Sequence, residues 1–348
     1  MTFSELDGEL SGVVSGLLKD GEGERLLTDW LGLEAPGADA TFAEVAAVLR
    51  EIGRAAAHTP YPAAALGVGS LTLLARTPDR DQVIHAAASG AVLPILALDG
   101  ETAAGTFRLR QTLDGDASFV LDAPTADHLL IPALDSQNEP VIVGVAPRTP
   151  GLTVAEQPVV DATRGFGRVV AEAVVPGSVW RFNDPDTALR RLADRAAVAI
   201  ACDSLGLSEA MLDATVAYAG VREQFGRTIG SFQAVKHACA DMLVQVTLAR
   251  RLVAAAVRGV ATDETGVAVS RAKSYACTAA VEIAGKAVQL HGGMGYTWEA
   301  GIHAYLKRAV LNRSLYGSPA QHRERVAEHF VDRRQRTVRS AARVRSRP

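Results

Sequence analysis

A chain of 348 residues is long enough to form two or three layers of core, so we expect it to divide into domains. Its formal net charge of −3 gives no indication of a nucleic-acid-binding or membrane-surface protein. No apolar run approaches the roughly 20 residues of a membrane-spanning helix, and the N-terminus lacks a basic region followed by an apolar core. Three scattered cysteines (Cys202, Cys239, Cys277) lack metal-ligand spacing, which favours reduced thiols in a cytoplasmic protein.

Residues 1–92 predict a helical N-terminal domain. Apolar side chains recur at three- and four-residue steps and form one helix face, at Phe42, Val45, Ala46, Leu49 and Ile52. Prolines at positions 60 and 62 interrupt this pattern, and an Ala- and Leu-rich run over 63–75 resumes it.

Residues 93–183 predict a middle antiparallel β-domain. Short apolar runs occupy Val92–Leu98, Ser118–Leu121, His128–Ile131, Val141–Val145 and Val169–Val175. Turn residues such as Asp99-Gly100 and Asp114-Gly115 separate them, and this punctuation is typical of antiparallel strands.

Residues 184–331 predict a C-terminal bundle of the four-helix type. Helical periodicity covers 187–219, 232–260, 265–290 and 300–316, and long helices joined by short turns pack as antiparallel neighbours. The tail, 332–348, holds seven arginines and almost no large apolar residue, so we expect it to be disordered.

Two strings in the predicted bundle carry residues suited to a nucleotide cofactor. The first is Val-Arg-Glu-Gln-Phe-Gly at 221–226, continuing to 237, and the second is Gln-Leu-His-Gly-Gly-Met-Gly-Tyr-Thr at 289–297. A guanidinium offers a pyrophosphate a planar fork of donors, and paired glycines let backbone approach a ligand. Alone, each element is weak, because a single arginine is more often a surface ion-pair partner and Gly-Gly a helix-ending turn.

Together the two strings resemble the flavin-contacting signature of the acyl-CoA dehydrogenase family. The resemblance implies the fold of that family, in which flavin and acyl-CoA lie between the middle β-domain and the C-terminal bundle. It also implies that these positions reach across a subunit interface and hold the adenine side of an FAD bound mainly by the neighbour. The residues that carry this cofactor-binding role are Arg222, Phe225, Gln233, Gln289, His291, Gly292 and Gly293.

The catalytic glutamate that the resemblance implies is missing. Gly317 stands where the family has Glu in a Tyr-Glu-Gly-Thr run, and Ala196 stands at the alternative position, 26 residues before Arg222. Neither residue accepts a proton, so we assign no catalytic residue to this chain. The flavin-ring motif of the family, Thr-Glu-Pro followed by Gly-Ser-Asp, is also absent from residues 96–105.

Other polar residues give weaker hypotheses. Glu299, Glu101 and Asp99 could tempt assignment as replacement bases, but solvated acids in turns are the favoured interpretation of the last two. The histidines His237, His291 and His322 do not form a metal-spaced cluster, and no metal site is predicted. No Ser/His/Asp arrangement is suggested either.

The chain thus retains the half of an FAD site that it would donate to a neighbouring subunit. It has lost the half that it would use itself. This pattern, with the segment 296–323, resembles the degenerate subunit of heteromeric α2β2 acyl-CoA dehydrogenases of actinobacterial sterol degradation. The resemblance implies a homologous partner subunit that supplies the base, a shared FAD, and a bulky CoA thioester substrate, possibly a steroid side chain. Two alternatives stay open: a self-sufficient homo-oligomeric dehydrogenase with a non-standard base, and a flavin-free scaffold protein.

Overall fold

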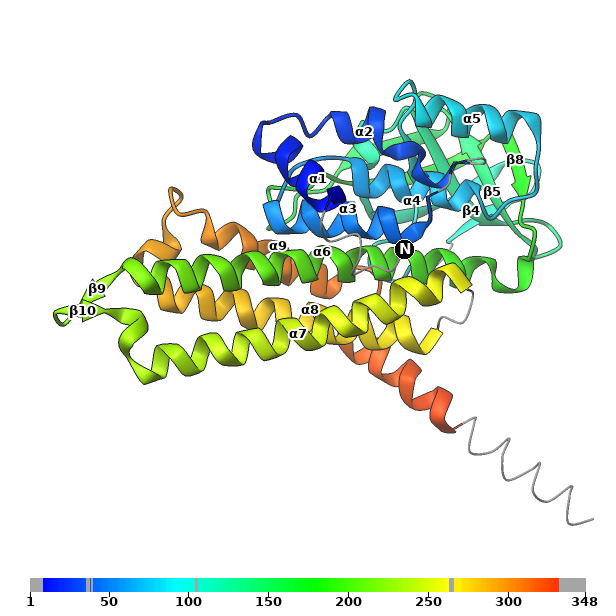
Figure 1. The fold of residues 1–348 in the computed structure, drawn as a ribbon. Helices are drawn as coiled ribbons and strands as arrows, with labels where there is room; N and C mark the ends of the chain where they lie inside the picture. The colour runs from blue at the N-terminus through cyan, green and yellow to red at the C-terminus, as the bar shows by residue number, and fades with distance from the viewer. Residues whose placement is uncertain (1–8, 36–37, 39, 104–105, 263–265, 332–348) are drawn as a thin grey trace, which may run out of the picture.

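The computed structural model describes residues 9–35, 38, 40–103, 106–262 and 266–331. The predicted tail at 332–348 lies outside the described residues. The N-terminal part is helical, as predicted, and lies against the long helices of the bundle (Figure 1). Its elements are α1 (Glu9–Lys19), α2 (Arg25–Asp29), the 3-10 turn η1 (Leu31–Glu34), α3 (Phe42–Ala55), α4 (Tyr61–Leu71) and α5 (Pro78–Ala88).

Helix α3 buries the apolar face predicted for residues 42–52. Its start is fixed by a capping box. The Thr41 hydroxyl accepts from the backbone N–H of Ala43, and the Glu44 carboxylate accepts from that of Thr41 at 2.7 Å. The helix ends at Ala55, and the next residue, Ala56, has a left-handed φ of 46°. Both ends are therefore set locally, and the buried face then packs along α6 (Pro185–Val221).

The middle part is an eight-stranded sheet with the strand order β6-β7-β3-β2-β4-β5-β8, and β1 also pairs with β4. Most neighbours are antiparallel, as predicted, but β1 and β2 each run parallel to β4. The strands are β1 (Pro94–Leu96), β2 (Phe107–Leu109), β3 (Leu113–Leu121), β4 (His128–Leu134), β5 (Pro140–Val145), β6 (Leu152–Glu156), β7 (Phe166–Val174) and β8 (Ser178–Arg181). A short 3-10 turn, η2 (Ala123–Thr125), joins β3 to β4.

The predicted apolar runs correspond to β1, β3, β4, β5 and β7. The sequence pattern missed β2, β6 and β8, which are short and partly exposed. An edge strand such as β6 buries little on either side, so it carries no apolar run that would reveal it.

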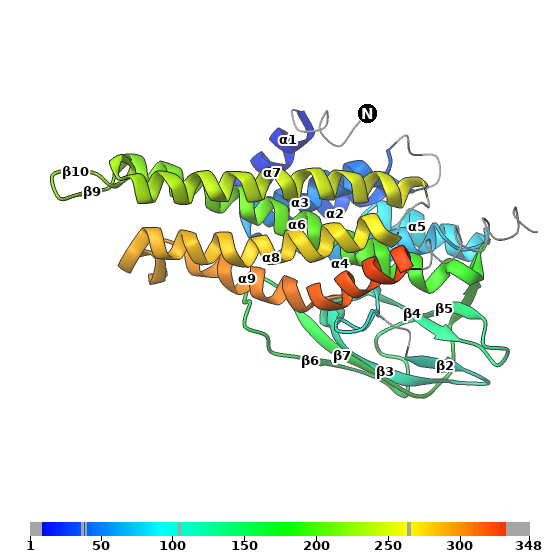
Figure 2. The same ribbon diagram turned by 90° about the horizontal axis from the view of Figure 1, so that it is seen from below.

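The C-terminal part is the predicted helical bundle. It consists of α6 (Pro185–Val221), α7 (Gln233–Thr262), α8 (Gly266–His291) and α9 (Ile302–Ser314), and a further helical segment covers 319–331. Figures 1 and 2 show α6, α7 and α8 side by side, with the sheet on one flank. Within the described residues, no helix is both long and apolar enough to cross a membrane. The domain limits at 92/93 and 183/184 stay predictions.

A buried charge cluster joins the three parts of the molecule. Arg308 of α9 donates to both carboxylate oxygens of Asp203 on α6, at 3.1 and 2.6 Å, and to the backbone carbonyl of Ala57 after α3. Arg164, between β6 and β7, lies 2.7 Å from the same carboxylate. The side-chain amide of Asn312 on α9 donates to Asp203 and accepts from Arg164.

The two neighbouring arginines determine whether Asp203 is ionised. Burial opposes the charged form, but the guanidinium groups of Arg164 and Arg308 outweigh it and hold the pKa of Asp203 well below its usual range. The cluster is therefore charged at neutral pH, and its members come from the β-domain and from two bundle helices.

We predict that Asp203→Ala lowers the free energy of unfolding by about 3–5 kcal/mol, because it leaves two buried guanidinium groups without their counter-ion. Urea denaturation followed by circular dichroism measures this. The matched control is Asp116→Ala, which breaks the exposed pair with Arg168 and should cost under about 1 kcal/mol. Equal effects of the two substitutions would contradict the structural role of the cluster.

Candidate functional site

The two sequence strings that carry the flavin signature lie at one end of the bundle. The first forms the hairpin β9 (Glu223–Gln224) and β10 (Arg227–Thr228) and the turn η3 (Ile229–Ser231), and the second ends α8 and forms η4 (Gly292–Tyr296). Tyr218, near the end of α6, stacks on His291 at a ring distance of 4.4 Å. Its hydroxyl donates to the His291 carbonyl at 3.4 Å. Figures 1 and 2 both show these segments at the same end of the molecule.

The hairpin turn presents an aromatic ring to solvent. Its two central residues, Phe225 and Gly226, have φ values of 54° and 75°, and two left-handed residues are what a tight hairpin of this type requires. The Phe225 side chain is 91% exposed and meets Phe232 edge-on. The strain of a left-handed phenylalanine therefore accompanies an outward-facing aromatic ring at the tip of the bundle.

The polar side chains among the predicted cofactor-binding residues also face outward. Arg222, Gln233 and Gln289 are exposed. Only the backbone of Arg222 is tied down, since its N–H donates to Tyr218 and its carbonyl accepts from Ile229. Within the described residues, the Arg222 guanidinium has no hydrogen bond or ion pair, whereas Arg164 and Arg308 are both paired with Asp203. A free guanidinium of this kind can bind an anion such as a pyrophosphate.

The glycine pair leaves open space, and His291 does not. Gly292 (φ 60°) and Gly293 are exposed, and a Cβ placed on either would meet no atom within 4 Å. A ligand can approach this backbone closely. His291 is buried, and its Nδ1 lies 2.7 Å from the Ala287 carbonyl, to which it donates. Six of the seven predicted residues are therefore exposed on segments at this end of the bundle, whereas His291 is buried.

The two positions where the family carries a base cannot supply one. Gly317 has a φ of 97°, and a Cβ there would lie 2.9 Å from Nε2 of His322. Its carbonyl accepts from Nζ of the buried Lys273 at 3.1 Å. Ala196 is fully buried in α6. The loop around position 317 is thus built for a glycine, and a glutamate side chain there would need the loop to change shape.

His322 holds this loop in place. The ring is fully buried, with Nε2 3.0 Å from the Tyr316 carbonyl and Nδ1 3.2 Å from the Ser270 hydroxyl. These contacts assign the neutral tautomer in which Nε2–H donates to the carbonyl and Nδ1 accepts from the hydroxyl. Burial lowers the pKa of His322 to about 4, and the nearby cations Lys273 and Arg325 act in the same direction.

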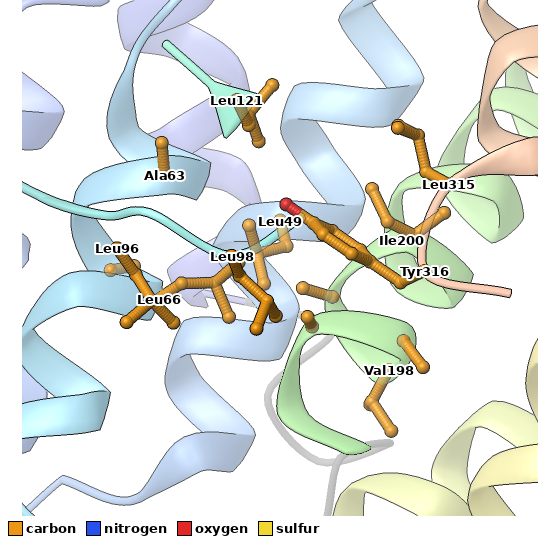
Figure 3. Close-up of a cluster of buried hydrophobic side chains, with 14 of the residues drawn as sticks. Leu49, Ala63, Leu66, Leu96, Leu98, Leu121, Val198, Ile200, Leu315 and Tyr316 are labelled. Carbon is orange, nitrogen blue, oxygen red and sulfur yellow. The ribbon is translucent and has the colours of Figure 1, made fainter. Parts of the chain in front are cut away.

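Side chains fill the junction of the N-terminal helices, the sheet and α6. Figure 3 shows the ring of Tyr316 extending among apolar side chains from these three parts. The labelled members are Leu49, Ala63, Leu66, Leu96, Leu98, Leu121, Val198, Ile200, Leu315 and Tyr316, all of which are buried. The backbone N–H of Tyr316 donates to the Gly100 carbonyl at 2.6 Å, which ties the loop after α9 to the turn between β1 and β2.

The three acidic residues considered as replacement bases differ in their surroundings. Asp99 was predicted to be a solvated turn acid, and this is wrong: its carboxylate accepts from Ser118, Glu101 and Thr102 and is half-buried. Burial opposes its ionisation, but these donors lower the pKa of Asp99 overall. Glu101 is exposed, as expected for a solvated acid, and Glu299 is exposed as well. Among the described residues, no three His, Cys, Asp or Glu side chains gather in a metal-binding arrangement.

Comparison with known sequences decides the family. Residues 187–331 match the model of the acyl-CoA dehydrogenase C-terminal domain. The acyl-CoA dehydrogenase IpdE2 of Mycolicibacterium smegmatis is 31% identical over 314 residues, which cover 88% of this chain and 87% of the relative. The chain belongs to the acyl-CoA dehydrogenase family.

Solved structures of acyl-CoA dehydrogenases share the fold. The ChsE4–ChsE5 complex from Mycobacterium tuberculosis matches with a TM-score of 0.84 and 25% identity, covering 95% of this chain and 99% of the matched chain. Butyryl-CoA dehydrogenase from Megasphaera elsdenii matches with a TM-score of 0.79 and 19% identity, covering 93% and 94%. The predicted fold class, with helical, β and helical parts in that order, is confirmed.

The buried histidine gives this acyl-CoA dehydrogenase chain a testable pH dependence. The folded-state pKa of His322, about 4, lies below its ordinary value of 6.5, so folding favours the neutral form. Its contribution is fully present above pH 6.5 and is lost as the pH falls toward 4, by about 3 kcal/mol at most. Asp122 acts oppositely, since burial raises its pKa to about 6 and acidification then stabilises the fold.

A comparison of the native protein with His322→Gln isolates the histidine, because Asp122 contributes equally to both. We expect the difference in unfolding free energy between the two proteins to shrink between pH 6.5 and 4. Urea denaturation over this pH range measures it. A difference that stays constant with pH would show that the His322 pKa is not lowered.

Proposed function

We propose that this chain is the non-catalytic subunit of an FAD-dependent acyl-CoA dehydrogenase complex. It would donate the adenine and pyrophosphate half of the FAD site to a homologous companion subunit, which would supply the glutamate base. One observation carries the proposal: the retained cofactor residues face outward at the bundle end, while the base positions are closed by Gly317 and Ala196. A site divided in this way is useful only across a subunit interface.

The outward-facing residues fit one half of an FAD. Arg222 would bind the pyrophosphate with a bidentate set of N–H donors, and the exposed backbone at Gly292 and Gly293 would allow close approach. Gln233 and Gln289 would supply amide contacts, and Phe225 an apolar face. When bound, FAD supplies the acceptor for the β-hydride while a carboxylate removes the α-proton of the thioester.

The chain's own interior does not fit the other half. The apolar cluster around Tyr316 fills the junction where the family fold implies flavin and acyl chain, and Asp99 is committed to backbone donors. The alternative of a self-sufficient homo-oligomer therefore has only Glu101 or Glu299 as a base. Both side chains are exposed to solvent, whereas the abstraction of a proton from carbon takes place in a site from which water is excluded. A flavin-free scaffold would leave the unpaired Arg222 without a role.

The assembly and the substrate belong to the same proposal. The likeness to a chain of the ChsE4–ChsE5 complex favours a heteromer, and we propose an α2β2 heterotetramer in the cytoplasm. The resemblance of residues 296–323 to the sterol-degrading branch favours a bulky CoA thioester, such as a steroid side chain, in which the complex forms an α,β-double bond.

Arg222→Ala tests this proposal. We expect the variant to assemble with its companion but to retain FAD at least about tenfold more weakly, because one charge-assisted contact to phosphate is lost. Flavin absorbance of the gel-filtered complex measures the retained fraction. The same variant should lower dehydrogenase activity at limiting FAD and recover with excess FAD.

The matched control is Arg110→Ala, which removes an exposed arginine from the turn between β2 and β3, far from the bundle end. It should leave FAD retention unchanged. Full FAD retention in Arg222→Ala would remove the assigned role of Arg222.

A further inference from the structure

Tyr218 stands out in α6 because it is the only Phe, Trp or Tyr among the 37 residues of that helix. Alanine and leucine are the commonest residues in the rest of α6. The Tyr218 side chain is half-buried, and it lies one helical turn before Arg222. The proposed contacts to FAD do not include Tyr218, so its ring needs another explanation.

The ring of Tyr218 lies on the ring of His291, the last residue of α8. The ring centroids are 4.4 Å apart and the planes are 21° from parallel, which is the geometry of a stacked pair. The Tyr218 hydroxyl donates to the His291 carbonyl at 3.4 Å, which is long for a hydrogen bond from a hydroxyl. We therefore assign the contact mainly to the two rings.

Each ring of this pair is fixed to the end of its own helix. Nδ1 of His291 donates to the Ala287 carbonyl at 2.7 Å, and only 8% of the His291 surface is exposed. On the other side, the Tyr218 carbonyl accepts from the backbone N–H of Arg222 at 2.8 Å. The pair therefore connects the end of α8 to the residue whose guanidinium is proposed to bind the pyrophosphate.

The hairpin after α6 has a separate contact with that helix. A Cβ at Gly230 in η3 would lie 2.8 Å from the Ala219 carbonyl, so the backbones of η3 and α6 approach closely there. This contact joins the hairpin to α6, whereas the stacked pair joins α6 to α8. The two sequence strings are thus placed relative to each other through Tyr218 and His291.

The spacing of the two strings matters for an anion that contacts both. The pyrophosphate of FAD is a compact group, so the guanidinium of Arg222 and the open backbone of Gly292 and Gly293 must be held at matching positions. Binding groups need to be placed to within about 0.5 Å by side chains whose own conformations are locked. A change in how α6 and α8 meet would move these contacts relative to each other.

We propose that Tyr218 is a positioning residue, whose stack on His291 sets the spacing between Arg222 and the glycine pair. It thereby controls how tightly the donated half of the FAD site holds the pyrophosphate. This inference rests on the proposed function. It also gives His291 a role different from the cofactor contact predicted from the sequence, because His291 acts by holding Tyr218.

Tyr218→Leu tests the inference, because it removes the ring and keeps an apolar side chain that favours a helix. Titration of FAD into the flavin-depleted complex with the companion measures the Kd for FAD. We expect Tyr218→Leu to raise this Kd about three- to tenfold, the range for loss of an aromatic pair. His291→Leu removes the other ring and should raise it to the same extent. Tyr218→Phe keeps the stack and should stay within about twofold of the native Kd.

A double variant separates positioning from a general loss of stability. Once Arg222→Ala has removed the guanidinium, its spacing no longer matters, so adding Tyr218→Leu should raise the Kd by less than about twofold more. The matched control is Tyr275→Leu, the same substitution at a half-buried position of α8, about 24 Å along the helix from His291. It should leave the Kd unchanged.

Gel filtration and thermal unfolding check that each variant folds and assembles. A native Kd in Tyr218→Leu or His291→Leu would overturn the inference and leave the proposed function standing. Effects of Tyr218→Leu and Arg222→Ala that multiply in the double variant would do the same. A native Kd in Arg222→Ala would contradict both the inference and the role of Arg222 in the proposed function.

Discussion

The buried pair of Asp203 and Arg308, with Arg164 beside it, is the interaction on which the rest of the structure depends. These charges connect α6, α9 and the loop between β6 and β7, and Arg308 also reaches the N-terminal helices through the Ala57 carbonyl. A buried ion pair adds little net stability but is costly to break, so it fixes which surfaces meet. Because α9 is fixed in this way, the loop after it is held against the turn between β1 and β2 by the hydrogen bond to Gly100.

Loss of the base and gain of internal packing are parts of one arrangement. The left-handed Gly317, the buried His322 and the Nζ of Lys273 form a closed set of contacts that leaves no room for a side chain at position 317. Tyr316 then extends into the apolar junction instead of bordering an open cavity. The bundle end, by contrast, is open and presents an unpaired arginine, two exposed glycines and a left-handed phenylalanine. The molecule is thus tightly packed where the family has its chemistry and open where it would meet a neighbour.

Sequence reasoning predicted the parts of the fold that bury one continuous face. The apolar steps of α3 and the runs of β4, β5 and β7 are long enough to reveal their period. The edge strand β6 and the parallel pairing of β1 and β2 with β4 depend on partners distant in sequence, so no local pattern indicates them. The exposed cofactor-binding residues around Arg222 were predicted from the two sequence strings. The roles of Lys273, Asp203 and His322 were not, although a lysine within an Ala-rich helix was a visible signal.

The most direct test of the divided site is the number of FAD molecules per chain, measured by absorbance for this protein alone and then for its complex with the companion. The account predicts a colourless protein alone and one FAD for each pair of chains in the complex. Near-full FAD occupancy of the isolated protein would contradict it, because the chain would then bind the isoalloxazine ring within its own fold.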